Sequence, residues 1–115
     1  MALSEFEIKK VEKAAESFLA ARRPPPEIRS KLDIGWRLED QSLFIFEIRP
    51  VWNNPSEFKE YPFAKASFVK SKGIWKIYWL RQNLKWNSYE PTPQVKSIES
   101  VFSTVSSDEH GCFFG

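Results

Sequence analysis

Residues 63–80 read FAKASFVKSKGIWKIYWL, and this stretch decides the fold. Apolar and polar side chains alternate on both sides of Ser71–Gly73, which is typical of a hairpin turn. We therefore predict antiparallel strands at residues 63–69 and 74–80. The second strand is apolar on both of its faces, and such a strand usually lies in the interior of a sheet.

Further strands are predicted on both sides of this hairpin. Residues 32–38 alternate apolar with polar side chains, and residues 43–49 begin with an apolar run. The stretch 50–62, which is rich in asparagine and proline, is predicted to be a loop. A short strand is expected at residues 85–90, so the sheet has four to five antiparallel strands.

Helices are predicted at both ends of the chain. Ser4 and Glu7 form a capping box, and the three prolines at 24–26 end the first helix because proline cannot continue it. The second helix is predicted to begin at Thr92, as its N-cap, with a proline in its first turn. The expected fold class is α+β, with an N-terminal helix, the antiparallel sheet, a C-terminal helix and a short apolar tail in a single domain over residues 1–115.

The predicted sheet has more apolar surface than the two helices can cover. Helices of these lengths cover about one sheet face, whereas strands 43–49 and 74–80 are apolar on both. We therefore expect either the tail 112–115 or a partner chain to cover the second face. A homodimer formed through this second face is one functional hypothesis.

Composition limits the chemistry that the chain can perform. Of its 115 residues, one is cysteine and one is histidine, so neither an internal disulfide nor a structural zinc site is expected. We predict no metal and no cofactor. The lone cysteine, the absence of a signal-peptide pattern and the shortness of the apolar runs predict a cytoplasmic protein with no membrane partner.

Residues 65–89 combine positive charge with aromatic rings. This segment holds six basic residues, no acidic residue and six aromatic rings. Cations neutralise phosphates and rings stack on bases, so the pattern favours a non-catalytic module that binds nucleic acid. The residues that we predict to bind the ligand are Lys65, Lys76, Tyr78, Arg81, Lys85, Trp86 and Arg49.

The same segment also has a purely structural interpretation. Trp75, Ile77 and Trp79 share one strand face, as in any core strand, and lysines near a turn are ordinary solvated side chains. The direction of Lys76 and Tyr78 decides between the two interpretations. If they point with Trp75 into the core, the binding hypothesis fails.

Glu47 is the one candidate for catalysis. With Asp33 or Asp40 upstream, Glu47-Ile48-Arg49 resembles the carboxylates and Glu-x-Lys of metal-dependent nucleases, in which the lysine assists the attacking water. Arg49 cannot give up its proton, however, and an ion pair between Glu47 and Arg49 explains the pattern more simply. His110 and Cys112 lack the third group of a nucleophilic site, so we expect the thiol to pack in the tail.

Several short motifs together resemble one protein family. They are Phe46–Pro50, Ala64–Ser71, Trp75–Trp79, Leu84–Trp86, Tyr89–Pro91 and the ending Gly111–Gly115. The chain resembles DUF3024, an uncharacterised bacterial family of short stand-alone proteins, over nearly its whole length. The resemblance implies a bacterial cytoplasmic protein and supplies no activity, ligand or catalytic residue.

Overall fold

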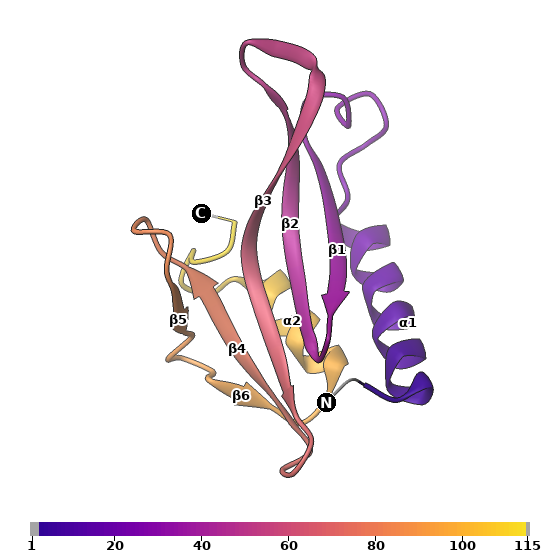
Figure 1. Cartoon of the computed structure of the whole chain (residues 1–115), viewed down its shortest axis with the longest axis vertical. Coiled ribbons are helices and arrows are strands. Elements are labelled where there is room, and N and C mark those ends of the chain that lie inside the picture. The colour runs from indigo at the N-terminus through magenta and orange to yellow at the C-terminus, as the bar shows by residue number, and fades with distance from the viewer. Residues whose placement is uncertain (1–2, 115) are drawn as a thin grey trace.

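The computed structural model describes residues 3–114. Two helices and six strands follow one another along the chain, with every strand pairing antiparallel (Figure 1). Their bounds are α1 Glu5–Arg22, β1 Asp33–Glu39, β2 Ser42–Val51, β3 Asn54–Val69, β4 Ile74–Leu80, β5 Trp86–Ser88, β6 Gln94–Val95 and α2 Ile98–Ser107. The predicted α+β class and order of elements are confirmed.

The sheet order is β1-β2-β3-β4-β5, and β6 pairs with β4 beside β5. Strands β2 and β4 are interior, as their apolar faces predict. The β4 edge is covered in two pieces, because Trp79 pairs with Asn87 of β5 and Trp75 pairs with Val95 of β6. The two-residue β6 was not predicted, since a strand of that length shows no alternation.

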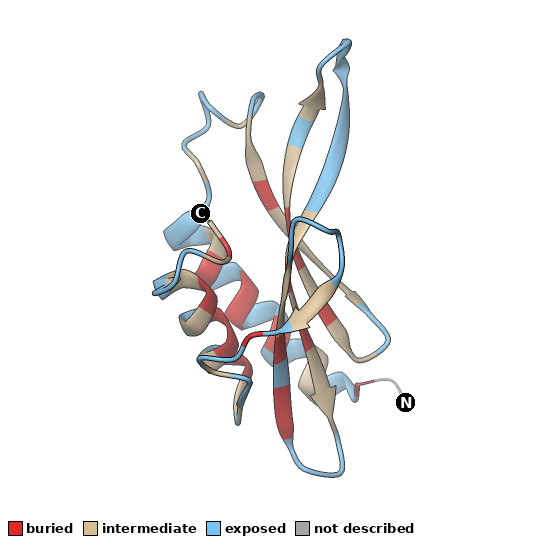
Figure 2. Cartoon of the chain, turned by 90° about the vertical axis from the view of Figure 1, so that its left-hand side faces the viewer, coloured by how far each residue is buried: buried red, intermediate tan, exposed pale blue. Residues whose placement is uncertain are grey.

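Both helices pack against the same face of the sheet, which we call the inner face (Figure 2). The core between the layers holds the side chains of Val11, Ala15, Phe18, Leu43, Ile45, Ile77, Val101, Phe102 and Val105. Small residues of β3 lie opposite large ones of β4: Ala64 pairs with Trp79 and Ala66 with Ile77. This alternation lets the large side chains fill the layer without collision.

The helix α1 has the predicted capping box. The Glu7 amide donates to Ser4 Oγ at 3.2 Å, and the Ser4 amide donates to Glu7 Oε1 at 2.9 Å. The helix α2 begins later than predicted, because Ser97 is its N-cap and accepts from the Ser100 amide at 3.1 Å. Thr92 instead lies in a turn and Val95 in β6, since this segment is needed to cover the β4 edge.

The predicted loop 50–62 is wrong. Strands β2 and β3 continue through it as a hairpin arm around the two-residue turn Trp52–Asn53 (top of Figure 1). The arm projects past the helices, so most of its side chains are exposed and show no buried face. Sequence patterns for strands depend on a buried face, which explains the error.

An irregularity in β3 marks the base of this arm. Ile45 pairs with Ala64 but Phe46 pairs with Pro62, so Phe63 is an extra residue in β3. Proline cannot donate to the ladder, and bulges bend the strand that holds them. The bulge places Phe63 against the helix side of the sheet, where its ring meets that of Phe114 at 5.1 Å.

The tail does not cover the second face of the sheet. Asp108 adopts a left-handed conformation after α2, and its carboxylate accepts from the amides of Phe113 and Phe114 at 2.9 Å each. Phe113 is then buried on the inner side, 4.9 Å from the Tyr89 ring. Of the two predicted alternatives for covering the second face, the tail or a partner chain, the first is wrong as far as Phe114; Gly115 lies outside the described residues.

Within residues 3–114, neither helix is long and apolar enough to span a membrane. The face of the sheet opposite the helices, which we call the outer face, has neither helix nor described tail over it (Figure 2). The candidate functional site lies on this face.

Candidate functional site

One row of side chains crosses the outer face from β1 to β5. Cross-strand pairing places Arg37 beside Phe44, Phe44 beside Lys65, Lys65 beside Tyr78, and Tyr78 beside Ser88. Side chains in such a row point to the same side of the sheet. Since Ile77 and Trp79 flank Tyr78 in β4 and point to the inner face, Tyr78 and Lys76 point outward, as the binding hypothesis requires.

Lys65 lies among three aromatic rings. Its Nζ is 5.5 Å from the ring centroid of Tyr78, 5.6 Å from that of Phe44 and 6.0 Å from that of Trp86. The Trp86 side chain of β5 lies on the same face, since its ring contacts the Phe44 ring edge-on at a centroid distance of 6.0 Å. An ammonium group at such distances is attracted by the electron-rich ring faces.

A second, polar row runs beside the first. The hydroxyls of Ser42 and Ser67 are hydrogen-bonded at 2.8 Å, and the exposed Lys76 and Gln94 follow on β4 and β6. Neither Lys65 nor Lys76 forms an ion pair with any residue between 3 and 114. Both ammonium groups are therefore able to pair with an anionic ligand.

The β1 side of the outer face is closed and its charges are paired. Arg37 donates to Glu39 at 2.7 Å and to Glu60, and its guanidinium lies 5.4 Å from the Phe44 centroid and 5.2 Å from the Phe46 centroid. Phe46 is consequently only 5% exposed although it points away from the helices. Gly35 lies beneath it, where a Cβ atom would come within 2.7 Å of the Phe46 ring.

The structure brings together four of the seven predicted ligand-binding residues, namely Lys65, Lys76, Tyr78 and Trp86. Arg49 lies on the opposite side of β2, where it donates to Glu47 at 2.9 Å. Arg81 lies against Trp79, with its guanidinium 5.6 Å from the ring centroid. Lys85 is exposed in the loop between β4 and β5, beside the site and outside its rows.

Phe44, Arg37 and Ser42 belong to this surface and were not predicted. Phe44 lies in an apolar run that gives no indication of which face each side chain takes. Its position becomes clear only from the pairing of Phe44 with Lys65 across β2 and β3. The one sequence feature that indicated an apolar side chain on the outer face was that residues 43–46 are apolar on both faces of the strand.

The carboxylates of the nuclease hypothesis do not come together. Asp33 receives two bonds of 2.8 Å from Arg23, a pairing that holds the pKa of its carboxyl below the ordinary value. Asp40 lies in the turn at the other end of β1, and Glu47 is occupied by Arg49. Among residues 3–114, no three acidic, histidine or cysteine side chains gather closely enough to hold a metal ion.

Comparison with known families gives one match. Residues 3–115 match the family described as "Domain of unknown function (DUF3024)". The chain belongs to DUF3024. No curated protein matches it, and no solved structure does. The resemblance inferred from the short motifs is confirmed, and the match assigns this DUF3024 chain no activity.

The terminal cysteine of this DUF3024 chain is poorly suited to nucleophilic chemistry. Burial, together with the nearby Asp108 carboxylate, raises the pKa of the Cys112 thiol, which lowers the fraction of reactive thiolate. Its sulfur lies 3.9 Å from the His110 carbonyl oxygen rather than against the imidazole. The thiol is half-buried and packs against the core.

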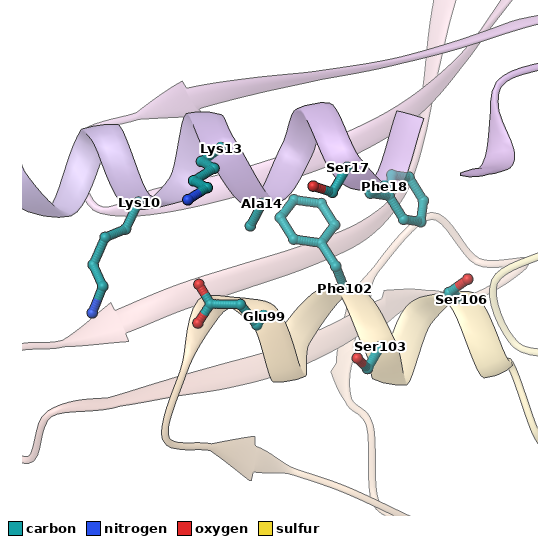
Figure 3. Close-up of a pocket in the computed structure, with 9 residues that line it drawn as sticks. All are labelled: Lys10, Lys13, Ala14, Ser17, Phe18, Glu99, Phe102, Ser103 and Ser106. Atoms are coloured by element: carbon teal, nitrogen blue, oxygen red, sulfur yellow. The ribbon is translucent and has the colours of Figure 1, made fainter. Parts of the chain in front are cut away.

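The DUF3024 chain also has a groove of about 580 Å³ between α1 and α2 (Figure 3). Its floor is formed by Phe18 and Phe102, whose ring centroids are 5.1 Å apart and whose side chains are almost wholly buried. Glu99 lies across from Lys10 and Lys13 on the rim. Because the rim carries charges of both signs, the groove favours neither an anionic nor a cationic ligand.

Proposed function

We propose that this protein is a non-catalytic binding module that holds nucleic acid on the outer face of its sheet. The observation that carries the proposal is the position of Lys65. Its ammonium group has three aromatic rings within 6.0 Å and no ion-pair partner among residues 3–114. Lys76 adds a second cation on the same face that forms no ion pair with any residue between 3 and 114.

This arrangement supplies the two interactions that nucleic acid offers. Ammonium groups attract phosphates, and the association gains from released counterions. Tyrosine and tryptophan rings stack on bases of any sequence. A cytoplasmic location, which the lone cysteine favours, would place the protein where such ligands are abundant.

The proposal is tested by titrating labelled single- and double-stranded oligonucleotides at several salt concentrations. We expect binding at low salt that weakens as salt rises. Tyr78→Ala should weaken binding by about tenfold, since one stacked base contributes about 1–3 kcal/mol. Lys65→Gln should weaken binding and flatten its salt dependence.

The matched control is Lys13→Gln, which removes the same charge from the rim of the groove between the helices. It should bind as the unmodified protein does. If no oligonucleotide binds at low salt, or if Lys13→Gln and Lys65→Gln weaken binding equally, the outer face is not a nucleic-acid site.

A homodimer through the outer face is the second candidate, and one observation favours it. Phe44, Tyr78 and Trp86 are half-buried rings on a face that no described element covers. A two-fold axis that passes beside Lys65 and Lys76 would, however, bring each toward its own copy, and like charges in contact oppose association. Sedimentation at several concentrations decides between the two, because a monomer at all of them excludes the dimer.

A further inference from the structure

The charges of the outer face are unevenly distributed. Arg37 of β1 pairs with Glu39 of the same strand and with Glu60 in the arm part of β3, and about half of each glutamate side chain is exposed. The unpaired cations Lys65 and Lys76 lie on β3 and β4. A phosphate chain is therefore attracted at the β3–β5 side and repelled at the β1 side.

The width of the face excludes the grooves of a duplex. Five neighbouring strands span about 19 Å at the usual strand spacing, whereas the major groove is about 12 Å wide. The rings of Phe44, Tyr78 and Trp86 are therefore poorly placed to enter the groove of an undistorted duplex. They can reach only bases that have been freed from a duplex.

We infer that the site takes a short single strand of nucleic acid whose track ends at Glu39 and Glu60. This inference rests on the proposed function and names its ligand. From β2 to β5 the track is about 14 Å long, which holds at most about four nucleotides, the number at the 3.4 Å spacing of a fully stacked strand. Two free lysines limit the phosphate contacts to about two, or three where Lys85 of the adjacent loop joins them.

Those contacts fix the expected salt dependence. Each phosphate contact of a single strand contributes about −0.7 to the slope of log affinity against log salt. Two contacts give a slope of about −1.4, and three give about −2.1. With oligothymidylates and oligouridylates of about two to twelve nucleotides, affinity should rise up to about four nucleotides. Beyond that length it should rise only as the number of equivalent binding positions does.

The role of Glu39 and Glu60 as the end of the track is tested by removing their negative charges. In Glu39→Gln/Glu60→Gln, Arg37 becomes free to contact a phosphate, so the slope should steepen by about 0.7 and the length limit should increase. The matched control, Glu12→Gln/Glu16→Gln, removes the same charge from exposed positions of α1 and should leave both unchanged. Circular dichroism before each titration verifies that the variants are folded.

The outcomes separate the inference from the function on which it rests. If duplex binds as tightly as single strand, if the slope is steeper than about −2.1, or if both double variants behave alike, the inference is wrong and the binding function stands. If no oligonucleotide of any length binds at the lowest salt, the proposed function itself fails.

Discussion

The two faces of the same sheet have opposite characters, and the contrast is sharpest between neighbours in β4. Ile77 is fully buried beneath the helices, whereas Tyr78, the next residue, is half-buried on a face without helices. The inner face consists of aliphatic and aromatic side chains, and the outer face alternates rings with cations. A strand that is apolar on both faces therefore need not be buried on both, because β4 has helices over one face only.

The largest expected effect separates the two faces directly. Ile77→Ala removes a fully buried side chain and should lower the free energy of unfolding by about 2–5 kcal/mol. Tyr78→Ala should lower it by about 1 kcal/mol or less while weakening oligonucleotide binding. Urea unfolding measures the first quantity. Equal losses of stability at the two positions would break the contrast between the faces.

The next effect tests whether the β1 side of the outer face is closed. Gly35→Ala would place a methyl group against the Phe46 ring, which is packed beneath Arg37, so we expect a loss of about 1–3 kcal/mol. In a Phe46→Leu background the loss should shrink, because the smaller side chain leaves room. The losses of stability are measured by thermal or urea unfolding. If the losses of the two single variants simply add in the double variant, Phe46 does not fill this space.

A smaller effect concerns the layer of helices that covers the inner face of the sheet. Ser97→Ala removes the N-cap of α2 and should cost about 1 kcal/mol. Thr92→Ala is the matched control and should cost less, since Thr92 lies in a turn outside the helix. If Thr92→Ala lost more stability than Ser97→Ala, the helix would begin at Thr92, as the sequence predicts.

The smallest effect concerns the ion pair that ties the end of α1 to β1. Hydrogen bonds from Arg23 lower the pKa of Asp33 below its ordinary value of 3.8. The folded state therefore gains stability from the ionised carboxylate above that pH, and loses it as the pH falls through the lower folded pKa. Asp33→Asn should thus be slightly less stable at neutral pH. This difference should shrink in acid; a difference independent of pH would exclude the ion pair as its cause.

The strands and their alternation could be predicted because each has a buried face. Residues 74–80 alternate around Ile77, and the capping box at Ser4 requires only local hydrogen bonds. The arm around Trp52 could not be predicted in this way, since Trp52 is 92% exposed and residues 53–61 are exposed as well. The start of α2 was misplaced because Val95 fits the helical period as well as it fits the β6 strand.

The site was predictable only in part, for a related reason. The sequence by itself determined that residues 65–89 carry cations and rings without acids, but it left open whether Lys76 and Tyr78 point away from the core. It did not determine which face the helices cover, nor that Phe44 lies beside Lys65. Those facts depend on strand pairing and layer packing between residues far apart in the chain, and only the tertiary structure decides them. Local patterns report the period of a strand, whereas a binding surface depends on which strands are neighbours and on what lies above them.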